Sequence, residues 1–145
     1  VPMRAPLLIV PFLVYAAAYA APGFKQNVPF PAFEVWAKGA SVPGMAFKEA
    51  KDEAEAYLAH FKAGAETFTV KIEGAGKFEG LAAGAKAFTW KTLEAKWQGS
   101  NPALIVVKYG DSKATLSVSF EGGKPKTQAE LEKLLASLKP EKILK

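Results

Sequence analysis

The strongest strand pattern in the chain is ALIVVKYGDSKATLSVSF, residues 103–120. Its first part, residues 103–109, is a continuous apolar run of the kind found in central strands, and Gly110-Asp111-Ser112 supplies a tight turn. From Ala114 onward, apolar residues alternate with serine and threonine, which is the period of a strand with one buried face. The stretch therefore predicts a β-hairpin within an antiparallel sheet.

Residues 67–73 and 88–97 predict two further strands before this hairpin. In residues 67–73, phenylalanine, valine and isoleucine alternate with polar residues. The apolar positions of residues 88–97 change parity near Lys91-Thr92, which indicates a bulge or corner inside one strand. A glycine-rich link, residues 74–84, is expected to join the two strands as a flexible hairpin connection. Four strands joined in sequence by short links predict an antiparallel meander.

Two helices are expected to cover the apolar face of this meander. Residues 44–63 place their apolar side chains on one helical stripe and their charged side chains opposite, and Gly64 ends the pattern. In the second helix, Thr127 and Glu130 have the spacing of a capping box. The apolar face of the second helix consists of Leu131, Leu134, Leu135 and Leu138. Residues 44–145 are therefore predicted to be a small α+β domain with the order helix, four-stranded antiparallel meander, C-terminal helix.

The N-terminal segment, residues 1–24, is apolar. No charged residue lies between Arg4 and Lys25, and a helix of that length, about 30 Å, would match the hydrocarbon core of a bilayer. Three interpretations are open: a targeting signal with a small-residue site at Ala18-Tyr19-Ala20, a retained transmembrane helix, or an apolar arm packed on this domain or on a neighbour. Because the chain begins with Val1, we also expect that a preceding segment has been removed.

Small residues near the end of this segment favour a membrane anchor. Ala16, Ala17, Ala20 and Ala21 form pairs four residues apart, so in a helix they would lie on one face that a partner helix can approach closely. Pro22-Gly23 would then end the helix. These four alanines are a candidate helix-packing face of an N-terminal transmembrane helix.

Residues 25–43 contain three prolines and show neither a helical nor a strand period, which favours an extended connector. Phe30, Phe33 and Trp36 are its candidate anchoring contacts. Aromatic residues this close to an apolar segment can lie at the level of the lipid headgroups, or they can hold the connector on the protein core.

The charge of the chain does not favour nucleic-acid binding. The formal net charge is +5, but Arg4 is the single arginine among 19 basic residues, and arginine is the residue that binds phosphates and guanines through a fork of donors. The lysines are spread evenly with acidic residues between them, so no basic run predicts a nucleic-acid surface. A weak attraction to an anionic membrane or an acidic partner is compatible with this charge.

No motif in the sequence indicates a reaction. The glycines of GAGKFEG, residues 74–80, have the wrong spacing for a dinucleotide fingerprint, and no amphipathic helix follows them. The chain has no cysteine, and its single histidine, His60, is more typical of a boundary position than of a ligand. We therefore expect no catalytic residue, no cofactor and no metal site. A small-molecule ligand between sheet and helices stays open, because aromatic residues are numerous enough to line a cavity.

The organisation of the chain predicts a non-catalytic accessory subunit of a membrane protein complex, held by the N-terminal helix and bound to other subunits. Because the apolar segment resembles the second half of a two-part plastid import signal, a photosynthetic complex in the thylakoid membrane is the first expected setting. A respiratory complex in the mitochondrial inner membrane is the second. The alternative is a soluble α+β module that binds a ligand or a partner and whose N-terminal segment packs on its own sheet or on that partner. The high alanine and lysine content also leaves a designed origin of this module open.

Overall fold

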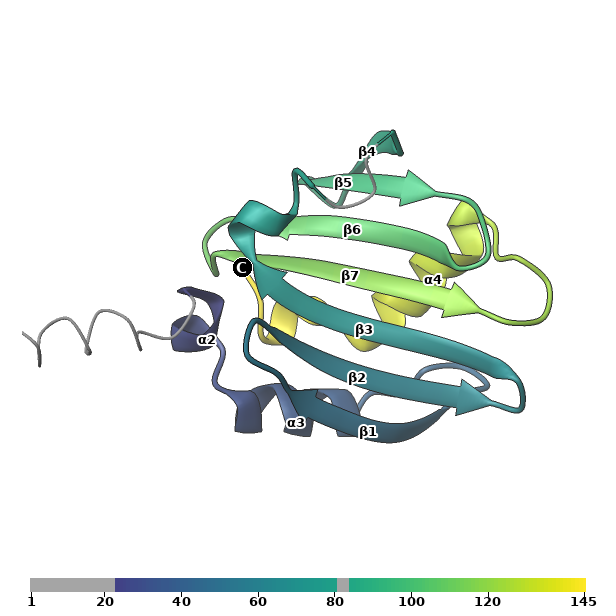
Figure 1. Cartoon of the computed structure of the whole chain (residues 1–145), viewed down its shortest axis with the longest axis horizontal. Helices are drawn as coiled ribbons and strands as arrows, with labels where there is room; N and C mark the ends of the chain where they lie inside the picture. Colours follow the sequence, from purple (N-terminus) through teal and green to yellow (C-terminus); the bar gives the residue numbers. More distant parts are fainter. Residues whose placement is uncertain (1–22, 81–83) are drawn as a thin grey trace, which may run out of the picture.

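The computed structural model describes residues 23–80 and 84–145, and its main feature is a single antiparallel sheet (Figure 1). Seven strands form this sheet, in the spatial order β1-β2-β3-β7-β6-β5-β4. The strands are β1 (Ala46–Asp52), β2 (Ala56–Ala63), β3 (Glu66–Gly74), β4 (Lys86–Trp90), β5 (Leu93–Gln98), β6 (Ala103–Tyr109) and β7 (Ala114–Glu121).

The two halves of the sheet meet where β3 pairs with β7. The chain leaves β3 at the centre, crosses to the far edge as β4, and returns strand by strand until β7 lies beside β3. The apolar side chains of these two strands face one another in register: Phe68 opposite Phe120, Val70 opposite Val118, and Ile72 opposite Leu116. All six are buried, so this pair of strands forms the middle of the hydrophobic core.

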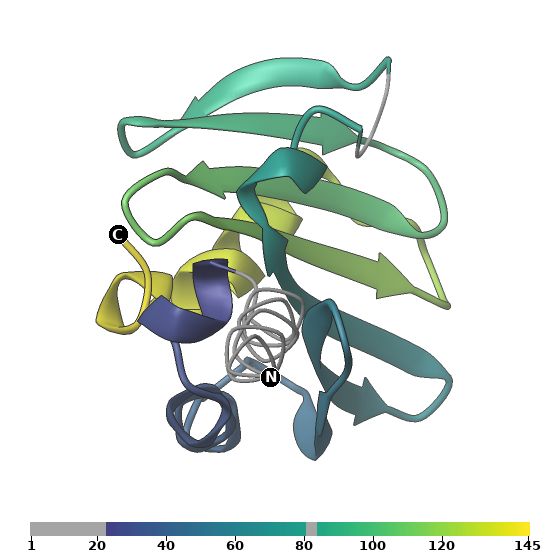
Figure 2. The same cartoon turned by 60° about the vertical axis from the view of Figure 1, so that its left-hand side comes forward.

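Helices cover one face of the sheet, as Figure 2 shows from the side. The helical elements on this face are α2 (Gly23–Asn27), α3 (Phe30–Lys38), α4 (Gln128–Leu138) and the short 3-10 turn η2 (Pro140–Lys142). A second 3-10 turn, η1 (Ala75–Lys77), lies on the opposite face (Figure 1). Helix α3 lies on β1 and β2, and α4 lies on β6 and β7. The alternating apolar residues of β2, β3 and β7 point toward this side, because directly paired residues share one face of a sheet. Val106 of β6 is also buried but lies on the opposite face, in register with Lys96 and Ser117.

The predicted helix over residues 44–63 is wrong, since this region forms the β1–β2 hairpin. Tyr57, Ala59 and Phe61 are buried at every second position, and each pairs with an apolar residue of β3. The same sequence fits a helical stripe and a strand alternation, because several apolar positions satisfy both periods. Pairing with β3 favours the strand, since it buries Tyr57, Ala59 and Phe61 on an existing apolar face.

The predicted four-stranded meander is also wrong. Trp90 and Leu93 are cross-strand partners, so the change of parity near Lys91-Thr92 is the turn between two strands and not a bulge within one. The glycine-rich link is a crossover from the centre of the sheet to its edge, and not a hairpin connection. The predicted fold class is thus corrected to a seven-stranded antiparallel sheet with few helices.

Of two predictions near the ends of the described region, the extended connector is wrong over residues 30–38 and the C-terminal helix is right. Residues 30–38, expected to be extended, form α3, because Pro29 and Pro31 lie at the start of the helix, where a missing N–H costs nothing. The C-terminal helix is confirmed, including its capping box. The Thr127 hydroxyl accepts from the Glu130 amide, and the Glu130 carboxylate accepts from the Thr127 amide.

The predicted transmembrane helix and its packing face, Ala16, Ala17, Ala20 and Ala21, lie outside the described residues. Among the helices that are described, none has both the length and the apolar character needed to cross a bilayer.

Tyr109 makes the stability of this fold sensitive to alkaline pH. Its ring is buried at the end of β6, and burial raises the pKa of Tyr109 from 10.0 to about 12. The unfolded chain therefore ionises first, so the contribution to stability is complete below pH 10 and is lost as the pH rises toward 12. The loss amounts to about 2–3 kcal/mol.

We predict that Tyr109→Phe removes this part of the pH dependence. Urea unfolding of the variant and of the unchanged chain at pH 8 and at pH 11 measures it. The unfolding free energy of the variant, measured relative to that of the unchanged chain, should be higher at pH 11 than at pH 8. An equal difference at both pH values would mean that Tyr109 ionises as easily in the folded chain as in the unfolded one.

Candidate functional site

The helical side of the molecule contains a groove between α3 and the end of α4. Helix α3 is tied to α4 by the Trp36 indole, whose N–H donates to the carbonyl of Lys139 at 3.2 Å. Lys139 has a positive φ of 51° and ends α4 in a left-handed conformation, after which η2 turns the chain back toward α3. The two elements thus form the two walls of one depression, although they are about a hundred residues apart in sequence.

The candidate anchoring residues Phe30, Phe33 and Trp36 all lie on α3 and face the sheet. Phe33 and Trp36 are buried in the core, and Phe30 is partly buried against it. The rings of Phe30 and Phe33 both pack on Tyr57 of β2, with centroids 5.3 and 5.2 Å away. These contacts fix the position of α3 on the sheet.

Tyr57 also joins α2 to this cluster. Its hydroxyl donates to the carbonyl of Val28 at 2.8 Å, and its ring lies edge-on to Phe24, which is fully buried. Burial, with a smaller contribution from Asp52, raises the pKa of Tyr57. The chain from Gly23 to Lys38 is therefore part of the packed structure on the helical side.

The groove itself is apolar and has a volume of about 680 Å³. Its α3 wall includes Val35, which is 73% exposed and is the one large hydrophobic side chain found exposed among the described residues. The full lining is Pro31, Ala32, Val35, Trp36, Gly39, Ala40, Ser41, Ser137, Leu138, Lys139, Lys142 and Ile143. An exposed valine beside an isoleucine and three further apolar α3 residues is a surface that water solvates poorly.

The charged residues of the groove are lysines. Lys139 and Lys142 lie in its lining, which includes no acidic residue. Neither lysine has an ion-pair partner within residues 23–80 and 84–145, whereas nearby Glu141 pairs with Lys91 at 3.3 Å. The groove therefore combines an apolar floor with positive charge along its η2 wall.

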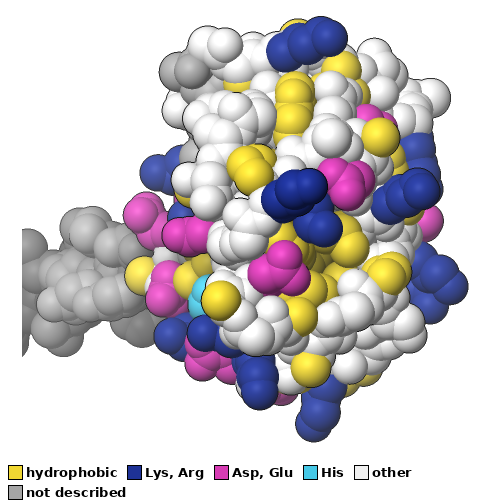
Figure 3. Space-filling model, turned by 90° about the vertical axis from the view of Figure 1, so that its right-hand side faces the viewer, with side chains coloured by type: hydrophobic (Ala, Val, Ile, Leu, Met, Phe, Trp, Pro, Cys, Tyr) yellow, Lys and Arg dark blue, Asp and Glu magenta, His cyan; other side chains and the backbone are white. Residues whose placement is uncertain are grey.

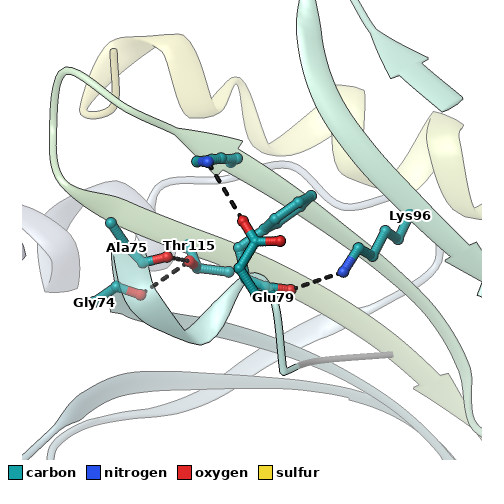
Figure 4. Close-up of polar contacts among 7 residues, drawn as sticks. Gly74, Ala75, Glu79, Lys96 and Thr115 are labelled. Carbon is teal, nitrogen blue, oxygen red and sulfur yellow. Dashed lines mark hydrogen bonds and ion pairs between the residues drawn. The ribbon is translucent and has the colours of Figure 1, made fainter. Parts of the chain in front are cut away.

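The opposite face of the sheet carries a short strap, residues 74–80, which follows β3 (Figure 4). The Thr115 hydroxyl donates to the carbonyl of Gly74 at 2.9 Å, and the Lys96 ammonium donates to the carbonyl of Phe78 at 3.1 Å. Glu79 pairs with Lys108 at 3.5 Å. Phe78 is 2% exposed, and the ammonium nitrogens of Lys96 and Lys108 lie 4.6 and 5.7 Å from its ring centroid.

These contacts explain what the glycine-rich stretch GAGKFEG does. The strap seats Phe78 on the polar face of the sheet between two lysines, which interact with the ring through its negative face. Its carbonyls accept hydrogen bonds from Thr115 and Lys96, and no helix N-terminus is offered to a phosphate in this stretch. The strap therefore has a structural role on this face of the sheet.

The titratable residues of the polar face form small, separate contacts and not one cluster. His60 contacts Glu49 across β1 and β2 at 3.0 Å. Glu73 lies apart from them, in a hollow with Glu53, Glu55 and Lys71, and one of its carboxylate oxygens is buried without a hydrogen-bond partner. In the described part of the chain, no group of three or more acidic, histidine or cysteine side chains is arranged to hold a metal ion.

On the face shown in Figure 3, basic and acidic side chains are both present and are spread among hydrophobic and neutral ones. The comparisons with known proteins add no assignment: no family model, no curated protein and no solved structure matches the chain. The site is therefore defined by its own geometry.

The sequence reasoning missed the groove because it missed α3. Once residues 30–38 are read as a helix, Phe33, Trp36 and Ala37 lie on its buried side, and Val35 falls on the other side. A large apolar residue on the outer side of an amphipathic helix is the signal that could have located the groove.

We predict that Phe78→Ala destabilises the fold by about 3 kcal/mol, because it removes a buried aromatic ring and leaves a cavity under the strap. Lys77→Ala is the matched control at the neighbouring position. The Lys77 side chain is exposed, so its removal should cost less than about 0.5 kcal/mol. Urea unfolding of both variants measures the two free energies. Equal small effects would show that Phe78 is not packed on the sheet.

Proposed function

We propose that the chain is a non-catalytic accessory subunit that binds an apolar segment of a partner in the groove between α3 and η2. The observation that carries the proposal is Val35, a large side chain left 73% exposed in an apolar groove. Exposed apolar surface in a concave site is typical of a binding surface, because covering it releases water.

The kind of occupant follows from the lining. The floor favours a helix or extended segment with aliphatic side chains, which can lie along the length of α3. Lys139 and Lys142 favour acidic residues beside that aliphatic face, because opposite charges steer a partner into one orientation. We therefore propose an amphipathic partner helix that carries glutamate or aspartate next to its apolar side.

The membrane setting of this subunit is the second part of the proposal. It rests on the uncharged stretch between Arg4 and Lys25, which is long enough for a transmembrane helix. A photosynthetic complex of the thylakoid membrane is the first setting proposed, and a respiratory complex of the mitochondrial inner membrane is the second. In either setting the groove would face a neighbouring subunit.

A small-molecule function is the competing proposal. It is favoured by the groove volume of about 680 Å³, which lies within the range of ligand pockets. A single-chain fatty acid would suit it, with its carboxylate beside Lys139 or Lys142 and its chain on Val35. Binding of a peptide or of a fatty acid distinguishes the partner-binding proposal from the small-molecule proposal.

We predict that a synthetic amphipathic peptide of leucine and alanine with glutamate on its polar side binds the groove, and that Val35→Glu weakens its affinity about tenfold. The introduced carboxylate would place a charge in the apolar contact and repel the peptide. Glu34→Gln is the control on the neighbouring, exposed position of α3. Fluorescence anisotropy of the labelled peptide measures both affinities.

Lys142→Glu makes the test specific for charge. This substitution should lower the affinity for the glutamate peptide and raise the affinity for a peptide with lysine in the same positions. Binding of dodecanoate instead of either peptide would favour the small-molecule function. No difference between Val35→Glu and Glu34→Gln would contradict a role of the groove.

For the membrane setting, we predict that the full chain stays with the membrane pellet after an alkaline carbonate wash, whereas a shortened chain that starts at Gly23 is released. The shortened chain keeps Phe24, which belongs to the core. Release of both chains would contradict the anchor and leave the groove proposal standing.

A further inference from the structure

The sheet is wider than its helical cover. Seven strands span about 29 Å at roughly 4.8 Å per strand. The main contacts of the described helices are with β1, β2, β3, β6 and β7, and not with β4 or β5. Helices α3 and α4 lie on β1, β2, β6 and β7, and at the other end Phe88, Leu93 and Trp97 are only partly buried. The outer strands β4 and β5 thus keep apolar side chains on the helical side that are half open to water.

The two edge strands differ in how they are protected. Strand β1 carries Lys48, Glu49, Lys51 and Asp52, and its register is interrupted between Phe47 and Glu49. Charges and register breaks of this kind keep an edge from pairing with another chain. Strand β4 has the sequence KAFTW, with one charge at its start and a regular register along all five residues. Its outer side has no strand partner among the described residues.

We infer that the outer edge of β4 pairs with β4 of a second copy of this chain, antiparallel and centred on Phe88. This centre is the one that pairs all five residues of each strand. It places Phe88 opposite Phe88 of the second copy, so that two half-buried rings cover each other. Lys86 then lies opposite Trp90 of the second copy, so no like charges face one another.

The same register fixes the pairs on the polar side. Ala87 lies opposite Thr89 of the second copy, and both residues are exposed in the single chain. The dimer would extend the sheet without changing either fold, because only an unpaired edge is used. This inference is independent of the groove, which is on α3 and η2.

Disulfide trapping tests the register, because the chain contains no cysteine of its own. Residues directly opposite in an antiparallel pair have Cα atoms about 4.5–5.5 Å apart, which suits a disulfide. After oxidation of the full chain with copper phenanthroline, Phe88→Cys should give a covalent dimer on a non-reducing gel. Ala87→Cys and Thr89→Cys, each alone, should not, whereas a mixture of these two variants should cross-link.

Charged variants at the two exposed positions test the same dimer without altering Phe88. Ala87→Lys combined with Thr89→Lys places like charges opposite each other and should raise the dimer dissociation constant about tenfold. Ala87→Lys combined with Thr89→Glu places opposite charges there and should keep the dimer. Sedimentation velocity over a wide range of concentrations measures both constants. A monomer at all concentrations, or cross-linking at positions 87, 88 and 89 alike, would overturn the inference.

Discussion

Pairing of β3 with β7 is the contact on which the rest of the structure depends. It joins a three-stranded hairpin unit to a four-stranded one and puts Val70, Ile72, Leu116 and Val118 at the centre of one apolar face. An apolar face of this size must be covered, and in the described residues α2, α3 and α4 lie on it. The position of the helices, and therefore of the groove between them, follows from the position of this strand pair.

The groove exists because α3 and α4 do not pack against each other along their whole length on the sheet. Helix α3 is held by aromatic contacts to Tyr57, and α4 by its leucines, so each helix is fixed by its own side of the sheet. They contact each other through the bond from Trp36 to the end of α4 and leave an apolar depression beside it. The strap with Phe78 covers part of the other face of the sheet.

Several elements could be predicted from the sequence, and others could not, for physical reasons. The strands over residues 67–73 and 114–120 and the capped C-terminal helix have one dominant period each, and residues 103–109 are a continuous apolar run. The structure places strands and helix there. Residues 44–63 satisfy two periods at once, and only the distant partner β3 selects between them. The crossover that brings β7 beside β3 has no local signal, because strand order depends on contacts far apart in sequence. The groove could not be predicted without α3.

Indole signals in a nitrogen–proton NMR spectrum test the role of the groove most directly. The chain has three tryptophans, of which Trp36 lines the groove, whereas Trp90 and Trp97 lie on β4 and β5. Trp36→Phe identifies the signal of Trp36 by its disappearance. Addition of the glutamate-bearing amphipathic peptide should shift the Trp36 signal and leave the other two unchanged. A shift of Trp90 or Trp97 with Trp36 unmoved would contradict the account.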